Sequence, residues 1–69
     1  MYEEYVGKKV QVQLMEEGPV AGRFLSGIVL DYLLADEDDE QSENELLIQG
    51  NYGLISIRES EIKTIAIME

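Results

Sequence analysis

Three short apolar runs on the carboxyl-terminal side of the chain limit the fold more than any other feature. They occupy residues 46–49, 54–57 and 62–67. Residues 50–53 (GNYG) separate the first two runs, and Gly and Asn tolerate the positive φ that tight hairpins need. The polar residues 58–61 (RESE) separate the second run from the third. This pattern predicts two strands joined by a tight turn, then a polar corner and a third strand.

Residues 10–14 (VQVQL) predict another strand upstream. They alternate strictly between apolar and Gln side chains, which is the period of a half-buried strand. Residues 16–19 (EEGP) predict the turn that follows, because Pro19 cannot donate a hydrogen bond within a sheet.

The long apolar stretch at residues 20–35 has two interpretations, a buried helix or a strand. Gly22 and Gly27 disfavour the helix, as do the β-branched residues of the stretch. We therefore expect a long strand that bends at Gly27. Strict alternation places Ile28, Leu30 and Tyr32 on one face and Val29 and Leu33 on the other. Because both faces are apolar, we expect the amino-terminal segment or another subunit to cover the second face.

Residues 1–9 predict one helical turn, in which Tyr2 shares an apolar face with Tyr5 or Val6. The elements together predict a single all-β domain over residues 1–69. We expect five antiparallel strands in a small SH3-like barrel with a short amino-terminal helix. The corner at 58–61 is expected to be the single 3₁₀ turn before the last strand.

Negative charge is concentrated in one segment. Fifteen acidic residues against five basic ones give a formal net charge of −10. Seven of those acids lie in residues 36–45 (DEDDEQSENE), and the other eight leave the rest of the chain at −3. Mutual repulsion predicts an extended, mobile acidic loop there. Because nucleic-acid affinity comes largely from basic groups, the charge disfavours binding to RNA or DNA.

The chain contains no Cys and no His, so neither a disulfide nor a His-containing metal site can support its small core. Self-association is the remaining usual support. The start of the chain does not resemble a signal peptide, and no apolar run approaches the roughly 20 residues that span a bilayer. We therefore expect a cytoplasmic protein without membrane contact and without a cofactor.

The order of elements resembles the Sm and Sm-like (LSm) family, including its bacterial Hfq branch. The sequence YEEYVGKKVQVQL is similar to the family's helix and first strand, and residues 20–34 are similar to its bent second strand. The sequence LLIQGNYGLISI resembles the second Sm motif, with Gln49 where the family has Arg, Gly50 at its Gly, and one extra residue in the turn. The Asp and the Met-Asn pair of the first motif have no equivalent. These differences affect positions that hold uridine in the family.

The resemblance implies a homo-oligomeric ring in which the fourth strand of one subunit pairs with the fifth strand of the next. Exposed β-branched edge strands favour the same arrangement, since unpaired edges aggregate. The candidate interface residues are Leu54, Ile55, Ile57, Ile65 and Ile67.

Two groups of residues are candidates for RNA contact. Gln49, Gly50, Asn51 and Tyr52 could line a pore, because amides bond base edges and Tyr stacks on bases. Turn chemistry alone also explains this segment, and we favour that interpretation. Lys8, Lys9 and Arg23 could contact phosphate, or they could be ordinary surface charge.

The acidic loop has three interpretations. Asp36, Asp38 and Glu40 alternate as ligands of a divalent cation do, but Gln41 stands where an EF-hand has Gly. A solvated loop is the favoured interpretation, and a docking surface for a basic protein is the third. We therefore expect no metal site.

We expect no enzymatic activity. The chain has no His or Cys, and no motif that would activate a Ser. Asp31 is the one candidate for a buried catalytic carboxylate, and an exposed Asp is the favoured alternative. The functional hypotheses are a ring that binds RNA and a ring that serves only as a structural or protein-interaction scaffold.

Overall fold

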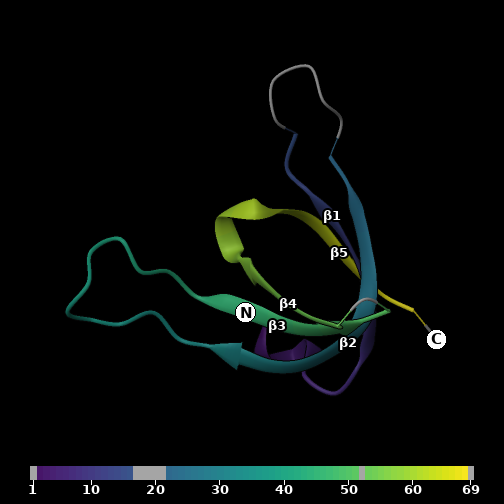
Figure 1. The fold of residues 1–69 in the computed structure, drawn as a ribbon, viewed down its shortest axis with the longest axis horizontal. Helices are drawn as coiled ribbons and strands as arrows, with labels where there is room; N and C mark the ends of the chain where they lie inside the picture. The colour runs from purple at the N-terminus through teal and green to yellow at the C-terminus, as the bar shows by residue number, and fades with distance from the viewer. Residues whose placement is uncertain (1, 17–21, 52, 69) are drawn as a thin grey trace.

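Five antiparallel strands form one sheet in the order β4-β3-β2-β1-β5 (Figure 1). The computed structural model describes residues 2–16, 22–51 and 53–68. The strands are β1 (Lys9–Leu14), β2 (Phe24–Leu33), β3 (Glu45–Gly50), β4 (Gly53–Arg58) and β5 (Ile62–Ile67). This confirms the predicted all-β class and the five strands. The sheet is open, with β4 and β5 at its two edges.

Two 3₁₀ helices complete the described elements, η1 (Glu3–Tyr5) and η2 (Glu59–Glu61). The segment before β1 therefore forms a helical turn as predicted, with 3₁₀ geometry. Gly7 follows it with φ 85°, a conformation that suits Gly, and its N–H donates to the Val29 carbonyl (2.7 Å). The polar corner before β5 is the predicted 3₁₀ turn. No helix in the described ranges is long and apolar enough to cross a membrane.

Strand β2 curves strongly along its length, and Gly27 lies in its first half (Figure 1). A Cβ at Gly27 would lie 2.4 Å from the Gln49 carbonyl oxygen and 2.7 Å from Ile48 Cγ2. Glycine is therefore required where β2 and β3 approach each other this closely. The strand is shorter than the apolar stretch at 20–35. Val20, Ala21 and most of the turn predicted at 16–19 lie outside the described residues.

The predicted alternation along β2 is wrong in its second half. The β2–β3 register shifts between Val29 and Asp31, so Val29 pairs with Ile48 and Tyr32 pairs with Leu46. Ile48 and Leu46 are both buried, so Val29 and Tyr32 face the core together. A bulge explains this, because the extra residue resets the period of two. Leu33 consequently joins Ile28 on the outer face.

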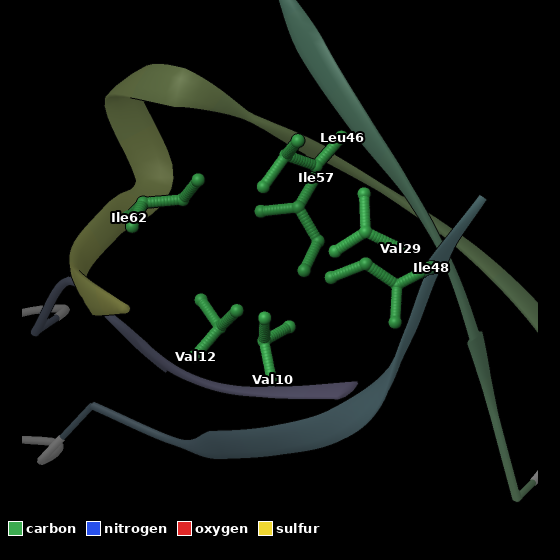
Figure 2. Close-up of a cluster of buried hydrophobic side chains, with 7 residues drawn as sticks. All are labelled: Val10, Val12, Val29, Leu46, Ile48, Ile57 and Ile62. Atoms are coloured by element: carbon green, nitrogen blue, oxygen red, sulfur yellow. The ribbon is translucent and has the colours of Figure 1, made fainter. Parts of the chain in front are cut away.

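The core consists of seven buried side chains drawn from all five strands (Figure 2). They are Val10, Val12, Val29, Leu46, Ile48, Ile57 and Ile62. Tyr2 and Tyr5 of the amino-terminal segment pack against this core, and the Tyr2 ring lies 6.0 Å from Tyr5 and 6.4 Å from Tyr32. Tyr2 and Tyr5 thus support the core face, and the outer face of β2 keeps exposed apolar side chains.

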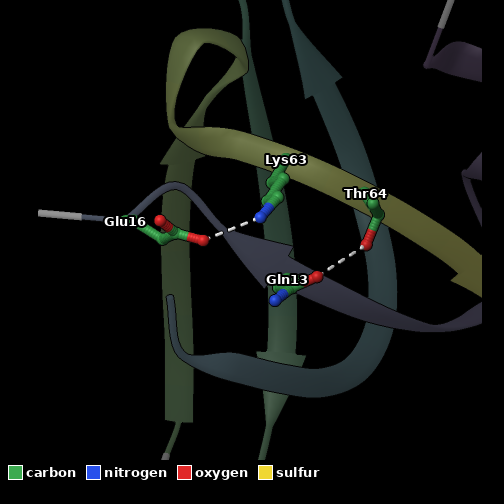
Figure 3. A network of polar contacts seen from close by, with 4 residues as sticks. All are labelled: Gln13, Glu16, Lys63 and Thr64. Carbon is green, nitrogen blue, oxygen red and sulfur yellow. Dashed lines mark hydrogen bonds and ion pairs between the residues drawn. The ribbon is translucent and has the colours of Figure 1, made fainter. Parts of the chain in front are cut away.

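Polar contacts hold β5 against the end of β1 (Figure 3). The Lys63 ammonium donates to Glu16 Oε1 at 2.8 Å, and the Thr64 hydroxyl donates to Gln13 Oε1 at 3.5 Å. The ammonium of Lys63 lowers the pKa of Glu16 through this hydrogen bond and through its charge. Both partners of the ion pair are largely exposed, so it fixes the position of the strand end more than it stabilises the fold.

We predict that Gly27→Ala destabilises the protein by about 1–3 kcal/mol, the range usual for overpacking a tight site. The added methyl group would meet the Gln49 carbonyl oxygen, which belongs to the backbone and cannot rotate away. Urea denaturation measures the loss of stability. Ser26→Ala is the matched control, because Ser26 is the exposed neighbour on β2 and its substitution leaves the approach to β3 unchanged. Equal stability of the two variants would contradict the prediction.

Candidate functional site

An open depression of about 380 Å³ lies where β1, β2 and the β3–β4 turn meet on the sheet. It is lined by Lys9, Ser26, Gly27, Ile28, Gln49, Gly50 and Asn51. Four of these residues were candidates from sequence, namely Lys9, Gln49, Gly50 and Asn51. The structure brings Lys9 together with Gln49, Gly50 and Asn51, although Lys9 lies about forty positions before them in the chain.

Strand register builds this depression. Lys9 pairs with Ile28, and Ile28 pairs with Gln49, so the three side chains form one row on the outer face. Gly50 lies so close to β2 that a Cβ there would be 3.3 Å from the Ser26 carbonyl oxygen. An ammonium, two side-chain amides and one aliphatic surface therefore face the same space. This donor set suits the binding of a polar ligand.

The other RNA-contact candidates lie elsewhere. Lys8 is exposed beside Lys9, with its carbonyl accepting from the Val29 N–H (3.0 Å), but it does not line the depression. Arg23 lies at the opposite end of β1, where its carbonyl accepts from the Leu14 N–H (2.8 Å). Tyr52 lies outside the described residues. The structure therefore separates Arg23 from the basic patch expected from the sequence.

The candidate interface residues divide between the core and the surface. Leu54 on β4 is 61% exposed and Ile67 on β5 is 45% exposed. Ile55 and Ile65 are half-buried against the core, and Ile57 is buried within it. The side chains of Leu54 and Ile67 are therefore accessible for contact with another subunit. The side chain of Ile57 is not, because it is buried in its own core.

The backbone of β4 directs hydrogen-bonding groups away from β3 at the sheet edge. The Glu59 N–H donates to the Asn44 carbonyl (2.9 Å), one pair beyond the Arg58–Glu45 pair of the β3–β4 ladder. Pairs in an antiparallel ladder alternate between two hydrogen bonds and none. Because the Glu59–Asn44 pair is hydrogen-bonded, the Ser56–Leu47 and Leu54–Gln49 pairs are not. The backbone groups of Leu54 and Ser56 therefore point away from β3.

The same reasoning applies to β5 at the other edge. The Met68 N–H donates to the Lys9 carbonyl (2.8 Å), one pair beyond the Ile67–Val10 pair. The backbone groups of Ile65 and Ile67 consequently point away from β1. Each edge of the sheet thus offers two residues whose N–H and C=O groups are directed outward.

The acidic loop contains consecutive hydrogen-bonded turns, which differ from the extended backbone expected from its charge. Its expected mobility stays a prediction. The Asp39 N–H donates to the Asp36 carbonyl and the Ser42 N–H donates to the Asp39 carbonyl. The Asp36 and Asp39 carboxylates accept from the amides of Asp38 and Gln41, respectively. Side-chain capping of this kind stabilises turns while the charges stay in water. Glu45, expected to end the loop, is the first residue of β3.

A polar cluster of Tyr32, Asn44 and Glu59 fixes the base of this loop. The Tyr32 hydroxyl donates to Glu59 Oε1 (2.7 Å) and accepts from Asn44 Nδ2 (2.8 Å). Asn44 Oδ1 accepts from the Ala35 N–H (2.7 Å), which ties both ends of the loop together. The hydrogen bond to Glu59, together with burial, raises the pKa of Tyr32. The sequence offers no signal for this cluster, because its members lie far apart in the chain.

Glu43 makes a second link between the loop and η2. Its Oε1 accepts from the Ser60 N–H (2.9 Å). Hydrogen bonds from Ser60, and secondarily the charge of Arg58, lower the pKa of Glu43 from its ordinary value of 4.5.

No polar or charged side chain among the described residues is buried, and no group of three or more Asp or Glu residues is arranged to hold a metal ion. Asp31 is exposed, and its Oδ1 accepts from the Tyr32 N–H (2.8 Å). The expectation that the protein is not an enzyme stays a prediction.

No protein-family model, curated protein or solved structure matches the chain. The geometry of the depression, the sheet edges and the loop is therefore the basis for a functional proposal.

We predict that Glu43→Gln reduces the loss of stability that acid produces. A carboxylate whose pKa is lowered by folding contributes stability above its unfolded pKa, and this contribution is lost as the pH falls through the folded pKa. The unfolding temperature of the wild type should therefore fall more steeply below about pH 4.5 than that of Glu43→Gln. Glu40→Gln is the control, since Glu40 is an exposed acid of the same loop. Parallel pH profiles for all three proteins would contradict the prediction.

Proposed function

We propose that the protein is an Sm-like scaffold that assembles by pairing the β4 edge of one subunit with the β5 edge of the next. The two edges of the open sheet are the two strands that the family resemblance implies pair between subunits. The observation that carries the proposal is the outward backbone of Leu54, Ser56, Ile65 and Ile67. Repeated head-to-tail pairing of identical subunits closes into a ring when the rotation closes.

The positions of these residues suit an antiparallel pairing. If Leu54 of one subunit lies opposite Ile67 of the next, Ser56 lies opposite Ile65. This follows because the sum of the two residue numbers is constant in an antiparallel register. Each of these pairs would exchange two backbone hydrogen bonds. Leu54 and Ile67, the two most exposed apolar residues of the edges, would then lie against each other and leave water.

The ends of the edges are already engaged within the subunit, which limits the register. The Arg58 N–H donates to Glu61 Oε1 (3.4 Å), so β4 offers Leu54 and Ser56 rather than its full length. A short free edge explains how the sheet could avoid unlimited aggregation while still pairing with one neighbour.

We predict that Ser56→Pro abolishes assembly. Proline removes the outward N–H without removing a bond to β3, and edge strands tolerate Pro at such positions. Size exclusion with light scattering should give a discrete multiple of 7.8 kDa for the wild type and a mass near 7.8 kDa for Ser56→Pro. Ser56→Ala keeps the N–H and should assemble like the wild type. A wild type that is monomeric across the micromolar range would refute the proposal.

The depression beside the β3–β4 turn favours RNA binding as a second function of the same scaffold. Lys9 can contact a phosphate, and the Gln49 and Asn51 amides can bond base edges. The net charge of −10 opposes the approach of RNA, so binding would require low salt.

We predict that any affinity for single-stranded RNA at low salt depends on Lys9 and not on Arg23. Lys9→Ala and Arg23→Ala remove the same charge, but only Lys9 lines the depression. Fluorescence anisotropy with a labelled oligouridylate should show a several-fold weaker complex for Lys9→Ala alone. Equal weakening by both variants would indicate non-specific attraction, and absence of binding by the wild type at low salt would exclude this second function.

A further inference from the structure

An apolar strip along the outer face of β2 and just beyond its end stays partly exposed among the described residues. The strip consists of Ile28, Leu30, Leu33 and Leu34. Ile28 and Leu30 are each 46% exposed, and Leu34 is 77% exposed. Ile28, Leu30 and Leu33 lie on the central strand of the sheet and Leu34 directly follows it, so pairing at the β4 and β5 edges would leave the strip uncovered.

The strip leads directly into the acidic loop. Leu34 follows the last residue of β2, and the loop with Asp36 to Glu40 extends beyond the ends of β2 and β3 (Figure 1). The Asp31 side chain also lies on the outer face, since Asp31 pairs with Leu47, which neighbours the buried Leu46 and Ile48. An exposed apolar surface is thus bordered on one side by strong negative charge.

We propose that this strip and the acidic loop form a docking surface for an amphipathic, basic segment of a partner protein. The apolar side chains would bury the apolar face of the segment, and the loop carboxylates would attract Lys and Arg residues at one end of it. A polar or acidic partner would leave the strip exposed or be repelled. The acidic loop would also repel an RNA partner from the Leu33 end of the strip, whereas Lys9 stands beside Ile28 at the other end.

The hydrogen bonds within the loop and at its base support this assignment. The turns at Asp36 and Asp39 and the Tyr32–Asn44–Glu59 cluster hold the loop base in a fixed position relative to β2. Charges held in this way attract a partner in one orientation, and less entropy is lost on binding than with a mobile acidic tail. The distance from Ile28 to Leu33 along β2 is about 17 Å. That is the length of roughly 11 residues of α-helix, or three turns.

The test uses a fluorescein-labelled amphipathic peptide of about 14 residues, with Leu on one helical face and Lys on the other. One control peptide carries Glu in place of Lys, and a second carries Ser in place of Leu. Anisotropy should show binding of the Leu/Lys peptide alone, and this binding should weaken as salt rises from about 0.05 to 0.5 M. Binding of all three peptides, or of none, would overturn the proposal.

Variants of the protein separate the two parts of the surface. The double variant Leu30→Ser, Leu33→Ser should weaken the Leu/Lys complex at least about tenfold. Phe24→Ser is the matched control, because Phe24 is an apolar outer-face residue of β2, 59% exposed, at the end away from the loop. Equal loss in the control would overturn the assignment of the strip.

A second variant tests the loop without touching the sheet. Glu37→Gln, Asp38→Asn and Glu40→Gln together remove three charges and leave the Asp36 and Asp39 carboxylates that cap the turns. This variant should lower the affinity and flatten its salt dependence, with an unchanged circular dichroism spectrum. An unchanged salt dependence would overturn the role of the loop. Tighter binding of a single-stranded RNA than of the peptide would overturn the choice of occupant.

This inference does not rest on assembly, and the same measurement on Ser56→Pro keeps the two proposals apart. Since the strip lies on β2, the monomeric variant should bind the peptide as the wild type does. A monomeric wild type that binds the peptide would refute only the assembly, and an assembled wild type that does not bind it would refute only the docking surface.

Discussion

The close approach of β2 to β3 at Gly27 is the constraint on which the rest of the structure depends. Because this position has no side chain, β2 can curve and carry its neighbours around a common interior. The seven core residues from five strands then face one another. A flat sheet of the same strands would leave its apolar face in water, and a domain of 69 residues has little other surface to bury.

The turn residues made the order of the elements predictable from the sequence. The register of β2 was not predictable. Turn residues at 50–53 and 58–61 mark the ends of strands in the sequence itself. Along β2, both faces are apolar, so the pattern contains nothing that reveals the bulge between Val29 and Asp31. Register is read from alternation, and where alternation is missing the faces cannot be assigned. The turns of the acidic loop were missed for a different reason, because Asp can cap a turn as well as repel its neighbours.

The candidate site was predictable only where its residues are neighbours in the chain. Gln49, Gly50 and Asn51 follow one another at the end of β3 and the start of the next turn, and turn chemistry together with the resemblance to the second Sm motif identified them. Lys9 was found by its charge, but its position beside that turn depends on two strand registers, and that of Ser26 depends on the β2–β3 register. The separation of Arg23 and the cluster around Tyr32 also follow from tertiary contacts, for which the amino-acid pattern carries no signal.

The pairing of β1 with β5 has a consequence for the rate of folding. Val10 lies opposite Ile67, so this ladder joins positions 57 residues apart. Contacts of such high sequence separation give a high relative contact order, and proteins dominated by them fold in milliseconds to seconds rather than microseconds. Until that ladder forms, β1 is itself an unpaired edge of the sheet, and β5 is a separate unpaired strand. The protein is therefore most exposed to misassociation while it folds, and rapid docking of β5 against β1 is what ends that period.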